Sequence, residues 1–122
     1  MPDNSKQNFA EFADIGIVGG GMVGAACALA CQVAGFAVHL IEAKPPTSWN
    51  PEQSPNVRMS FLSPQNIAWL EALGVWQTLQ TRRAQPCAAM WIWADQPERA
   101  LKLNAAELDA EYLGYLVENN VL

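Results

Sequence analysis

Apolar residues in the first third of the chain form short runs that are separated by turns. Residues 13–18 (Ala-Asp-Ile-Gly-Ile-Val) have the length and the β-branched content of a short buried strand. Three glycines at 19–21 end this run, and residues 22–34 then repeat with helical spacing. A second apolar run at 37–41 is typical of another strand. The pattern predicts the start of a right-handed parallel unit in the order strand, glycine turn, helix, strand.

One face of the predicted helix carries only small or medium side chains, which would let the helix lie close to a sheet. These residues are Val23, Cys27, Ala30 and Ala34, with Ala26 and Val33 beside them. Gly35 follows at the position where a left-handed glycine commonly ends a helix. His39, the single histidine, falls inside the second apolar run, and we expect it to pack there rather than to act in catalysis.

The middle of the chain predicts a long loop followed by two short helices. Residues 44–56 contain four prolines, and a loop of this length is commonly functional or disordered. Residues 58–62 could form a short extended segment. Ser63 and Pro64 are a favourable N-cap and first helical residue. The helix that they begin would end at a glycine, would be followed by a second helix at 75–83, and would bury Ile67, Leu70 and Leu73.

The last third of the chain predicts antiparallel strands. Residues 87–94 fit one strand, and 100–103 could pair with it across a turn. Residues 115–117 could form a short strand, and Glu118-Asn119 could open a helix. Trp91 and Trp93 share one face of the first of these strands. They could line an aromatic substrate pocket. We favour the alternative, that they pack in the core or between domains.

Composition and charge exclude several classes of function. The net charge of −5 disfavours binding to nucleic acid, because an acidic protein repels phosphate backbones. The sequence has no apolar stretch near the roughly 20 residues that cross a bilayer, and its start does not resemble a signal peptide. Charged residues make up only 16% of the chain, and there are five tryptophans. This composition indicates an apolar surface that is covered by a part absent from this chain. The alternative is a small protein with a tryptophan-rich core, which we favour less.

The three cysteines suggest neither a disulfide framework nor a metal centre. Cys27 and Cys31 are four residues apart on the predicted helix, and Cys87 is distant in the sequence. A pair at this spacing could hold a metal, but small thiols on a helix face far more often pack. We therefore expect no metal, and a reducing cytoplasm as the location.

The strongest chemical signal is a G-x-G-x-x-G motif at 19–24. Gly19 allows a tight turn out of the strand, and Gly21 lets the backbone approach a pyrophosphate. Gly24 lets the helix pack on the strand. The helix N-terminus, with its positive dipole end, would then face the phosphates. The motif alone is weak, but the preceding strand, the helix and the second strand predict a dinucleotide-binding unit.

An acidic residue stands at the end of the second predicted strand, as this unit requires. Glu42 lies 18 residues beyond Gly24, where a carboxylate accepts hydrogen bonds from an adenosine ribose and repels a 2′-phosphate. The alternative is a solvated strand end. The unit by itself does not distinguish FAD from NAD.

Four segments in order resemble one family. Residues 14–24 (Asp-Ile-Gly-Ile-Val-Gly-Gly-Gly-Met-Val-Gly) are similar to the FAD fingerprint of the group A flavoprotein monooxygenases. Residues 58–63 (Arg-Met-Ser-Phe-Leu-Ser), 73–76 (Leu-Gly-Val-Trp) and 112–122 (Tyr-Leu-Gly-Tyr-Leu-Val-Glu-Asn-Asn-Val-Leu) resemble segments of its ubiquinone-biosynthesis hydroxylases. Within that group, the last segment is more similar to the benzoquinol hydroxylases than to the other members. The resemblance runs from about residue 14 to residue 122.

The resemblance implies an FAD-dependent hydroxylase that uses NAD(P)H as reductant and O₂ as co-substrate. It implies an oxidoreductase that transfers one oxygen atom to an aromatic ring, here a polyprenyl phenol or quinol of ubiquinone biosynthesis. No catalytic residue is identified. Arg58 could instead be a surface arginine, and Asn119 a plain helix N-cap. The residues carried over as cofactor-binding are Gly19, Gly21, Met22, Val23, Gly24, Glu42, Ala43, Arg58 and Asn119.

The resemblance also implies an incomplete α/β fold. It would be a Rossmann-like FAD-binding βαβ unit with the beginning of an antiparallel β substrate-domain segment. We expect a flexible tail at 1–12, part of the FAD-binding domain at 13–86, part of the substrate domain at 87–116 and a return toward the FAD domain at 117–122. Family segments that complete the cofactor site, Asp-Gly and Gly-Asp-Ala-Ala-His, do not occur here, so we expect no turnover by this piece alone.

Two departures and two alternatives accompany this interpretation. Phe61 stands where the family usually has alanine, and Asn119 stands where related monooxygenases often have an arginine that touches the cofactor. A polyprenyl substrate implies contact with the membrane's inner face or with a biosynthetic complex. The alternatives are another FAD oxidoreductase that shares only the fingerprint, and a non-catalytic nucleotide-binding module.

Overall fold

The computed structural model describes residues 12–122, so most of the predicted tail at 1–12 lies outside the described residues. Contacts between residues divide the chain into two compact units, which meet in sequence between Pro46 and Thr47. Each unit is described by itself. The domain boundaries expected from the resemblance, after residues 86 and 116, stay predictions.

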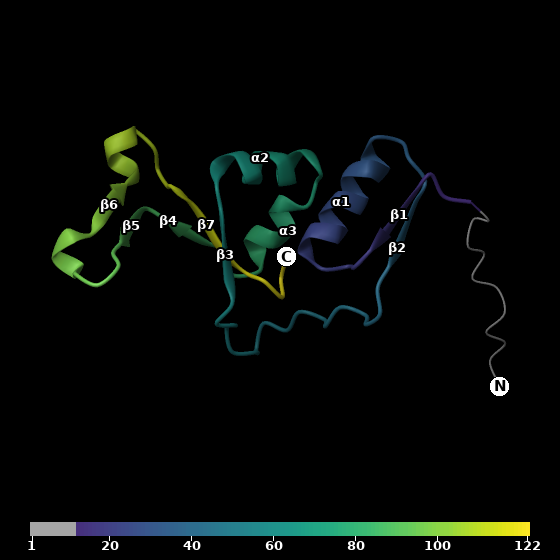
Figure 1. Ribbon diagram of the computed structural model, residues 1–122, viewed down its shortest axis with the longest axis horizontal. Coiled ribbons are helices and arrows are strands. Elements are labelled where there is room, and N and C mark those ends of the chain that lie inside the picture. The colour runs from purple at the N-terminus through teal and green to yellow at the C-terminus, as the bar shows by residue number, and fades with distance from the viewer. Residues whose placement is uncertain (1–11) are drawn as a thin grey trace. The chain divides into compact units, whose positions relative to one another are not determined.

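The first unit contains the predicted strand–helix–strand order (Figure 1). Strand β1 (Ile15–Val18) leads through the glycine turn into helix α1 (Met22–Val33), and strand β2 (Val38–Ile41) follows. The two strands are parallel, with Ile15 opposite Val38. This order confirms the predicted parallel unit, because two parallel strands need a crossover such as a helix between them.

Helix α1 ends as the sequence predicts. Gly35 has a φ of +94°, a left-handed conformation that costs glycine little because it has no Cβ. Its N–H donates to the carbonyl of Gln32 at 3.0 Å, and the N–H of Phe36 donates to the carbonyl of Cys31 at 3.1 Å. This pair of bonds is the Schellman arrangement, and it satisfies carbonyls that a helix end leaves unpaired.

The prediction of which α1 face is buried was wrong for most of its residues. Val23 is 78% exposed, and Cys27, Val33 and Ala34 are also exposed, whereas Ala26 and Ala30 are half-buried as expected. Gly24, outside the expected face, is half-buried too, and an added Cβ there would overlap the carbonyl oxygen of Gly19. Hydrophobic periodicity cannot find the packed face, because α1 is apolar on nearly every side.

The second unit is built around a three-stranded antiparallel sheet in the order β3-β7-β4. Strand β3 (Met59–Leu62) and strand β4 (Gln85–Cys87) both pair with β7 (Gly114–Glu118), which lies between them (Figure 1). The last strand of the chain therefore occupies the centre of this sheet. The extended segment expected at 58–62 and the strand expected at 115–117 are confirmed.

Two helices connect β3 to β4. Helix α2 (Pro64–Ala72) begins at Ser63, whose side chain accepts a hydrogen bond from the N–H of Asn66, as predicted for the N-cap. Helix α3 (Trp76–Thr81) follows. They pack on the sheet through one apolar core, which consists of Ile67, Leu70, Trp76, Leu79, Val117 and Val121. Leu73, expected to be buried, is half-buried.

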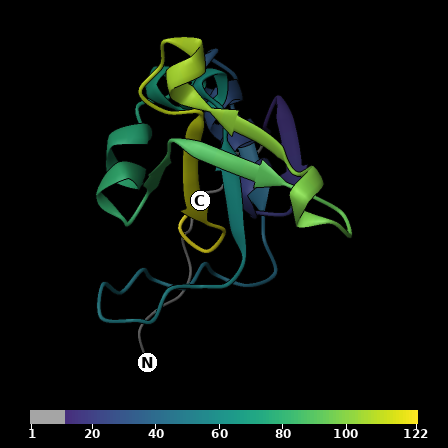
Figure 2. The ribbon, with the colours of Figure 1, turned by 90° about the vertical axis from the view of Figure 1, so that its left-hand side faces the viewer.

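A two-stranded hairpin extends from this sheet, as Figure 2 shows. Strand β5 (Ala89–Ile92) pairs antiparallel with β6 (Leu101–Asn104), and a short 3₁₀ helix, η1 (Pro97–Arg99), lies in the turn between them. A second one, η2 (Ala105–Leu108), follows β6. The predicted pairing across this turn is confirmed.

The single strand expected at 87–94 is divided into β4 and β5. The carbonyl of Cys87 accepts from Leu113, whereas the carbonyl of Ala88 accepts from Ala105, so the chain exchanges one partner strand for the other at this point. Trp91 is 60% exposed and Trp93 is 52% exposed, so the expectation of core packing was wrong for these two side chains. Interdomain packing and a substrate pocket stay open.

The segment after β7 forms a turn where the opening of a helix was expected. The carbonyl of Glu118 accepts from the N–H of Val121 at 2.9 Å and from that of Leu122 at 3.3 Å. These are the bonds of a single helix-like turn.

Candidate functional site

The glycine turn of the first unit has the conformation that the motif predicts. Gly19 has a φ of +101°, which lets the chain turn directly after β1 while its N–H still donates to the carbonyl of Ile41 at 2.8 Å. Gly24 lies against this turn, and an added Cβ there would overlap the carbonyl oxygen of Gly19. Gly24 therefore has to be glycine for α1 to start where it does.

Gly21 lies at the N-cap of α1 and faces open space. No heavy atom lies within 4 Å of the position that a Cβ would occupy. Its φ of −69° is ordinary, so its lack of a side chain serves access rather than backbone conformation. The first turn of α1, with its outward-directed N–H groups, follows immediately, and it contains no acidic residue that would repel an anion.

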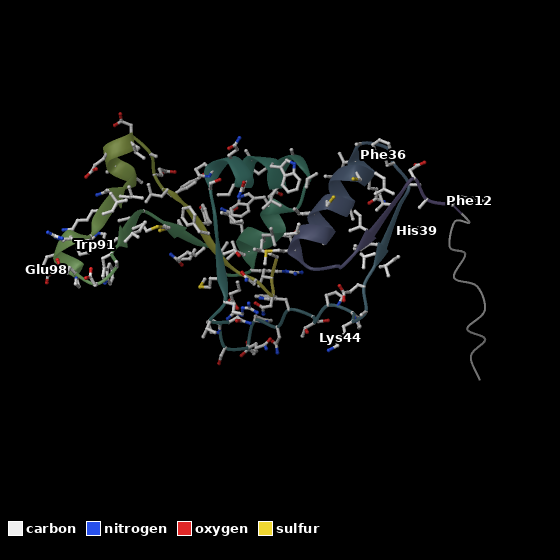
Figure 3. All side chains as sticks on the ribbon, in the orientation of Figure 1. Phe12, Phe36, His39, Lys44, Trp91 and Glu98 are labelled. Atoms are coloured by element: carbon white, nitrogen blue, oxygen red, sulfur yellow. The ribbon has the colours of Figure 1, made fainter. Side chains whose placement is uncertain are left out.

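Glu42 closes the turn from the end of β2. Its Oε2 accepts a hydrogen bond from the backbone N–H of Gly20 at 2.5 Å, and its Oε1 accepts from the N–H of Lys44 at 3.0 Å. The N–H of Lys44 lowers the pKa of this carboxyl most, and the N–H groups of Gly20 and Ala43 lower it further. Glu42 is therefore held as a carboxylate beside the glycine turn. Lys44, one of its two donors, is labelled in Figure 3.

Gly20 is a site residue that the sequence reasoning missed. An added Cβ would lie 3.0 Å from the Cβ of Glu42 and 3.2 Å from its Oε2. Gly20 thus provides both the N–H that binds the carboxylate and the space into which the side chain folds. The signal in the sequence was the unbroken glycine triplet, of which the motif explains only the first and third residues.

The second unit brings together the other two predicted cofactor residues. The N–H of Asn119 donates to the carbonyl of Arg58 at 3.0 Å, although the two residues are far apart in sequence. The hydroxyl of Ser60 donates to Oδ1 of Asn119 at 2.7 Å, which fixes the orientation of the carboxamide. The side chain of Arg58 is exposed.

The predicted site residues therefore form two groups, one in each unit. Gly19, Gly21, Met22, Val23, Gly24, Glu42 and Ala43 lie at or beside the glycine turn of the first unit. Arg58 and Asn119 adjoin in the second. Within residues 12–122 no group of three or more His, Cys, Asp or Glu side chains could hold a metal ion. Burial raises the pKa of the Cys31 thiol, and a hydrogen bond with Cys27 raises it further.

Comparison with known proteins agrees with this geometry. Residues 17–61, which include the glycine turn and Glu42, match the model of the NAD(P)-binding Rossmann-like domain. The 3-demethoxyubiquinol 3-hydroxylase of Escherichia coli (strain K12) is 41% identical over 109 residues, which are 89% of this chain and 28% of that protein. The ubiquinone biosynthesis monooxygenase COQ6 of Homo sapiens, a mitochondrial protein, is 30% identical over 117 residues, 89% of this chain and 24% of that protein.

A solved structure is similar over the same length. The p-nitrophenol 4-monooxygenase of Pseudomonas putida DLL-E4 superposes with a TM-score of 0.60 and 25% identity, over 88% of this chain and 26% of that one. The chain fits the family of FAD-dependent monooxygenases. It spans about a quarter of the length of the curated relatives that it matches. The predicted family and the α/β class with a Rossmann-like unit are thereby confirmed.

In this monooxygenase-like chain, the sequence reasoning also missed a buried ion pair beside Asn119. Glu118 is 2% exposed, and its Oε1 lies 3.3 Å from Nε of Arg83. The only signals were a glutamate directly after the apolar residues of β7 and the adjacent Arg82-Arg83 pair. Among the helices of residues 12–122, none has the length and apolar character needed to cross a membrane.

Proposed function

We propose that this chain is the FAD-binding portion of an aromatic hydroxylase that acts on a polyprenyl phenol or quinol of ubiquinone biosynthesis. The observation that carries the proposal is the carboxylate of Glu42 bound to the N–H of Gly20 at the start of α1, in a chain 41% identical to a demethoxyubiquinol hydroxylase. The chain spans 28% of that hydroxylase, and we propose that these 122 residues bind the cofactor without turning over substrate.

The glycine turn fits the pyrophosphate of a dinucleotide. The open space beside Gly21 admits a phosphate to backbone contact, and the first N–H groups of α1, at Met22 and Val23, would face it. The positive end of the helix dipole favours the negative charge there.

Glu42 fits the ribose of the adenosine half. Each carboxylate oxygen already accepts one backbone N–H, and each retains capacity for a further donor such as a ribose hydroxyl. The lowered pKa keeps the carboxylate in the accepting form, and its charge would repel a ribose 2′-phosphate. Ala43 lies next to it and would contact the adenosine.

Arg58 and Asn119 are the residues of the second unit that we propose bind the cofactor. A guanidinium suits a pyrophosphate, because it donates in a planar fork. The carboxamide of Asn119, whose oxygen is occupied by Ser60, would present its N–H₂ group as a donor. When bound, FAD reduced by NAD(P)H would supply the O₂ chemistry that hydroxylates the ring. The protein's own part is to hold the cofactor and to exclude water.

The relatives also suggest where in the cell the protein would bind its substrate. A polyprenyl chain partitions into the bilayer, so the protein would work at the inner face of the membrane or with partners that present the quinol. The exposed tryptophans of the β5–β6 hairpin, of which Trp91 is labelled in Figure 3, lie in the part predicted to belong to the substrate domain.

The proposal is tested by titrating the purified chain with FAD, following flavin fluorescence and the thermal midpoint together. A ligand that binds only the folded chain must raise that midpoint. We expect saturable binding that Glu42→Ala and Gly21→Val each abolish. NADH is titrated in parallel, because the Rossmann-like match also fits an NAD-binding module. Binding of NADH but not FAD would reject the proposal in favour of that second function.

A further inference from the structure

A cluster around Arg83 and Glu118 joins the long loop to the central strand of the second unit. The N–H of Asn56 donates to Oε2 of Glu118 at 2.8 Å. Nη1 of Arg83 donates to the carbonyl of Gln53 at 2.9 Å, and its guanidinium lies 5.8 Å from the centre of the Trp49 ring. We call these five residues the anchoring cluster. Three of them belong to the loop, which otherwise contains no helix or strand.

The cluster is costly to form, which indicates that it has a purpose. A carboxylate that is 2% exposed loses most of its hydration, and such a group persists only when it is paired and hydrogen-bonded. Arg83 is a non-glycine residue with a φ of +65°, a conformation that L residues rarely adopt. Replacement of the pair by apolar side chains would avoid the cost of desolvation.

The anchored loop leads directly to the candidate cofactor residues. Asn56, held by Glu118, also accepts from the N–H of Arg58 through its Oδ1 at 2.8 Å. The carbonyl of Arg58 accepts from Asn119, which is the next residue after Glu118. A closed path of contacts thus connects the ion pair to the two predicted cofactor residues of this unit.

We propose that Arg83 and Glu118 are positioning residues, which fix the loop on β7 and thereby hold Arg58 and Asn119 in the arrangement that binds the cofactor. This inference rests on the proposed function. The two residues act through the loop and contact no cofactor themselves. Their role is to reduce the number of conformations from which Arg58 binds, because a ligand binds more weakly to a site that is only fractionally formed.

The test combines amide hydrogen exchange of the chain with FAD titration. Glu118→Gln keeps an acceptor for the N–H of Asn56 but removes the charge that attracts Arg83. We expect amides of residues 47–58, and that of Asn119, to exchange about tenfold faster, and the FAD dissociation constant to rise about tenfold, because the buried ion pair that orders the loop is lost. The single variant Arg83→Lys, which keeps a cation near the carboxylate of Glu118, should retain most of the protection from exchange and most of the FAD affinity of the parent.

Arg99→Gln is the matched control. Arg99 is an exposed arginine of η1 with the same charge, and in the described structure it is paired neither with Glu118 nor with the Trp49 ring. It should leave loop exchange and FAD affinity unchanged. If Glu118→Gln does not fold, the double variant Arg83→Met with Glu118→Gln removes both charges together and is expected to fold with the same loose loop.

The outcomes separate this inference from the proposed function. Faster exchange of the loop with an unchanged FAD dissociation constant would overturn the positioning role, as would unchanged exchange. If the parent chain binds no FAD, the proposed function fails. The exchange of the Asn119 amide, which donates to Arg58, then still decides whether the ion pair holds these two residues together.

Discussion

The carboxylate of Glu42 accepts a hydrogen bond from the backbone N–H of Gly20, a residue 22 positions earlier in the chain. This bond ties the end of β2 to the turn that follows β1. The acid at the strand end therefore shapes the glycine turn in addition to its predicted contact with a ribose. Changes on either side of the bond should alter both stability and nucleotide binding.

Gly20→Ala should show this coupling. The new Cβ would lie 3.0 Å from the Cβ of Glu42, so the side chain must move and the hydrogen bond must weaken. We expect a lower free energy of unfolding and weaker FAD binding. Gly16→Ala, where nothing lies within 4 Å, is the control. Equal behaviour of the two variants in urea unfolding and FAD titration would contradict the prediction.

Gly21→Ala and Gly24→Ala should distinguish the access of FAD to the glycine turn from the stability of the fold. At Gly24 the Cβ would overlap the carbonyl of Gly19, so α1 cannot start in place, and the unfolding free energy should fall by about 3 kcal/mol or more. At Gly21 the Cβ enters open space, so stability should be kept while FAD binding weakens. Circular dichroism during thermal unfolding, with FAD titration, measures both. Loss of stability in the Gly21 variant would be the contrary result.

Local signals explain how much of this structure could be predicted from the sequence. The glycine turn, the Schellman end at Gly35 and the Ser63 cap each depend on residues close together in the chain. Their residue types require particular backbone conformations, so their positions were found correctly.

Long-range contacts explain the rest. Gly24 packs α1 closely against the carbonyl of Gly19, and hydrophobic periodicity does not show which face packs when a helix is apolar on most sides. The bond from Asn56 to Glu118 spans 62 residues, and it depends on β7 lying between β3 and β4. Neither the central place of β7 nor the buried ion pair could be read from spacing along the chain.

The stability of the glycine turn should depend on pH, because Glu42 holds the turn only as a carboxylate. The pKa of this carboxyl lies below its ordinary value of 4.5, because backbone N–H groups of Lys44 and Gly20 stabilise the charged form. The stabilisation is therefore complete above pH 4.5 and is lost as the pH falls through the lowered pKa of the folded state. The amide shift of Gly20, followed by NMR, should titrate with a midpoint below 4.5 and be flat in Glu42→Gln. A midpoint above 4.5 in the parent chain would show that the carboxylate is not held by these donors.

The stability of the second unit should depend more on the buried face of α2 than on its exposed face. Ile67 is 3% exposed in the core, and Trp69 on the same helix is 46% exposed. Ile67→Ala removes buried methyl and methylene groups and leaves a cavity, so the free energy of unfolding should fall by about 2–5 kcal/mol. Trp69→Ala should change it far less, although it deletes a larger side chain, because much of the indole is already in water.

Urea unfolding followed by circular dichroism tests this pair, and the NMR shift of the Gly20 amide adds a second measurement. The glycine turn lies in the first unit, so the hydrogen bond between Gly20 and Glu42 should survive a weakened core in the second. The Gly20 amide shift should accordingly match the parent in both variants. A larger loss of stability in Trp69→Ala than in Ile67→Ala would mean that the exposed face of α2, and not the Ile67 face, carries the packing that holds this unit together.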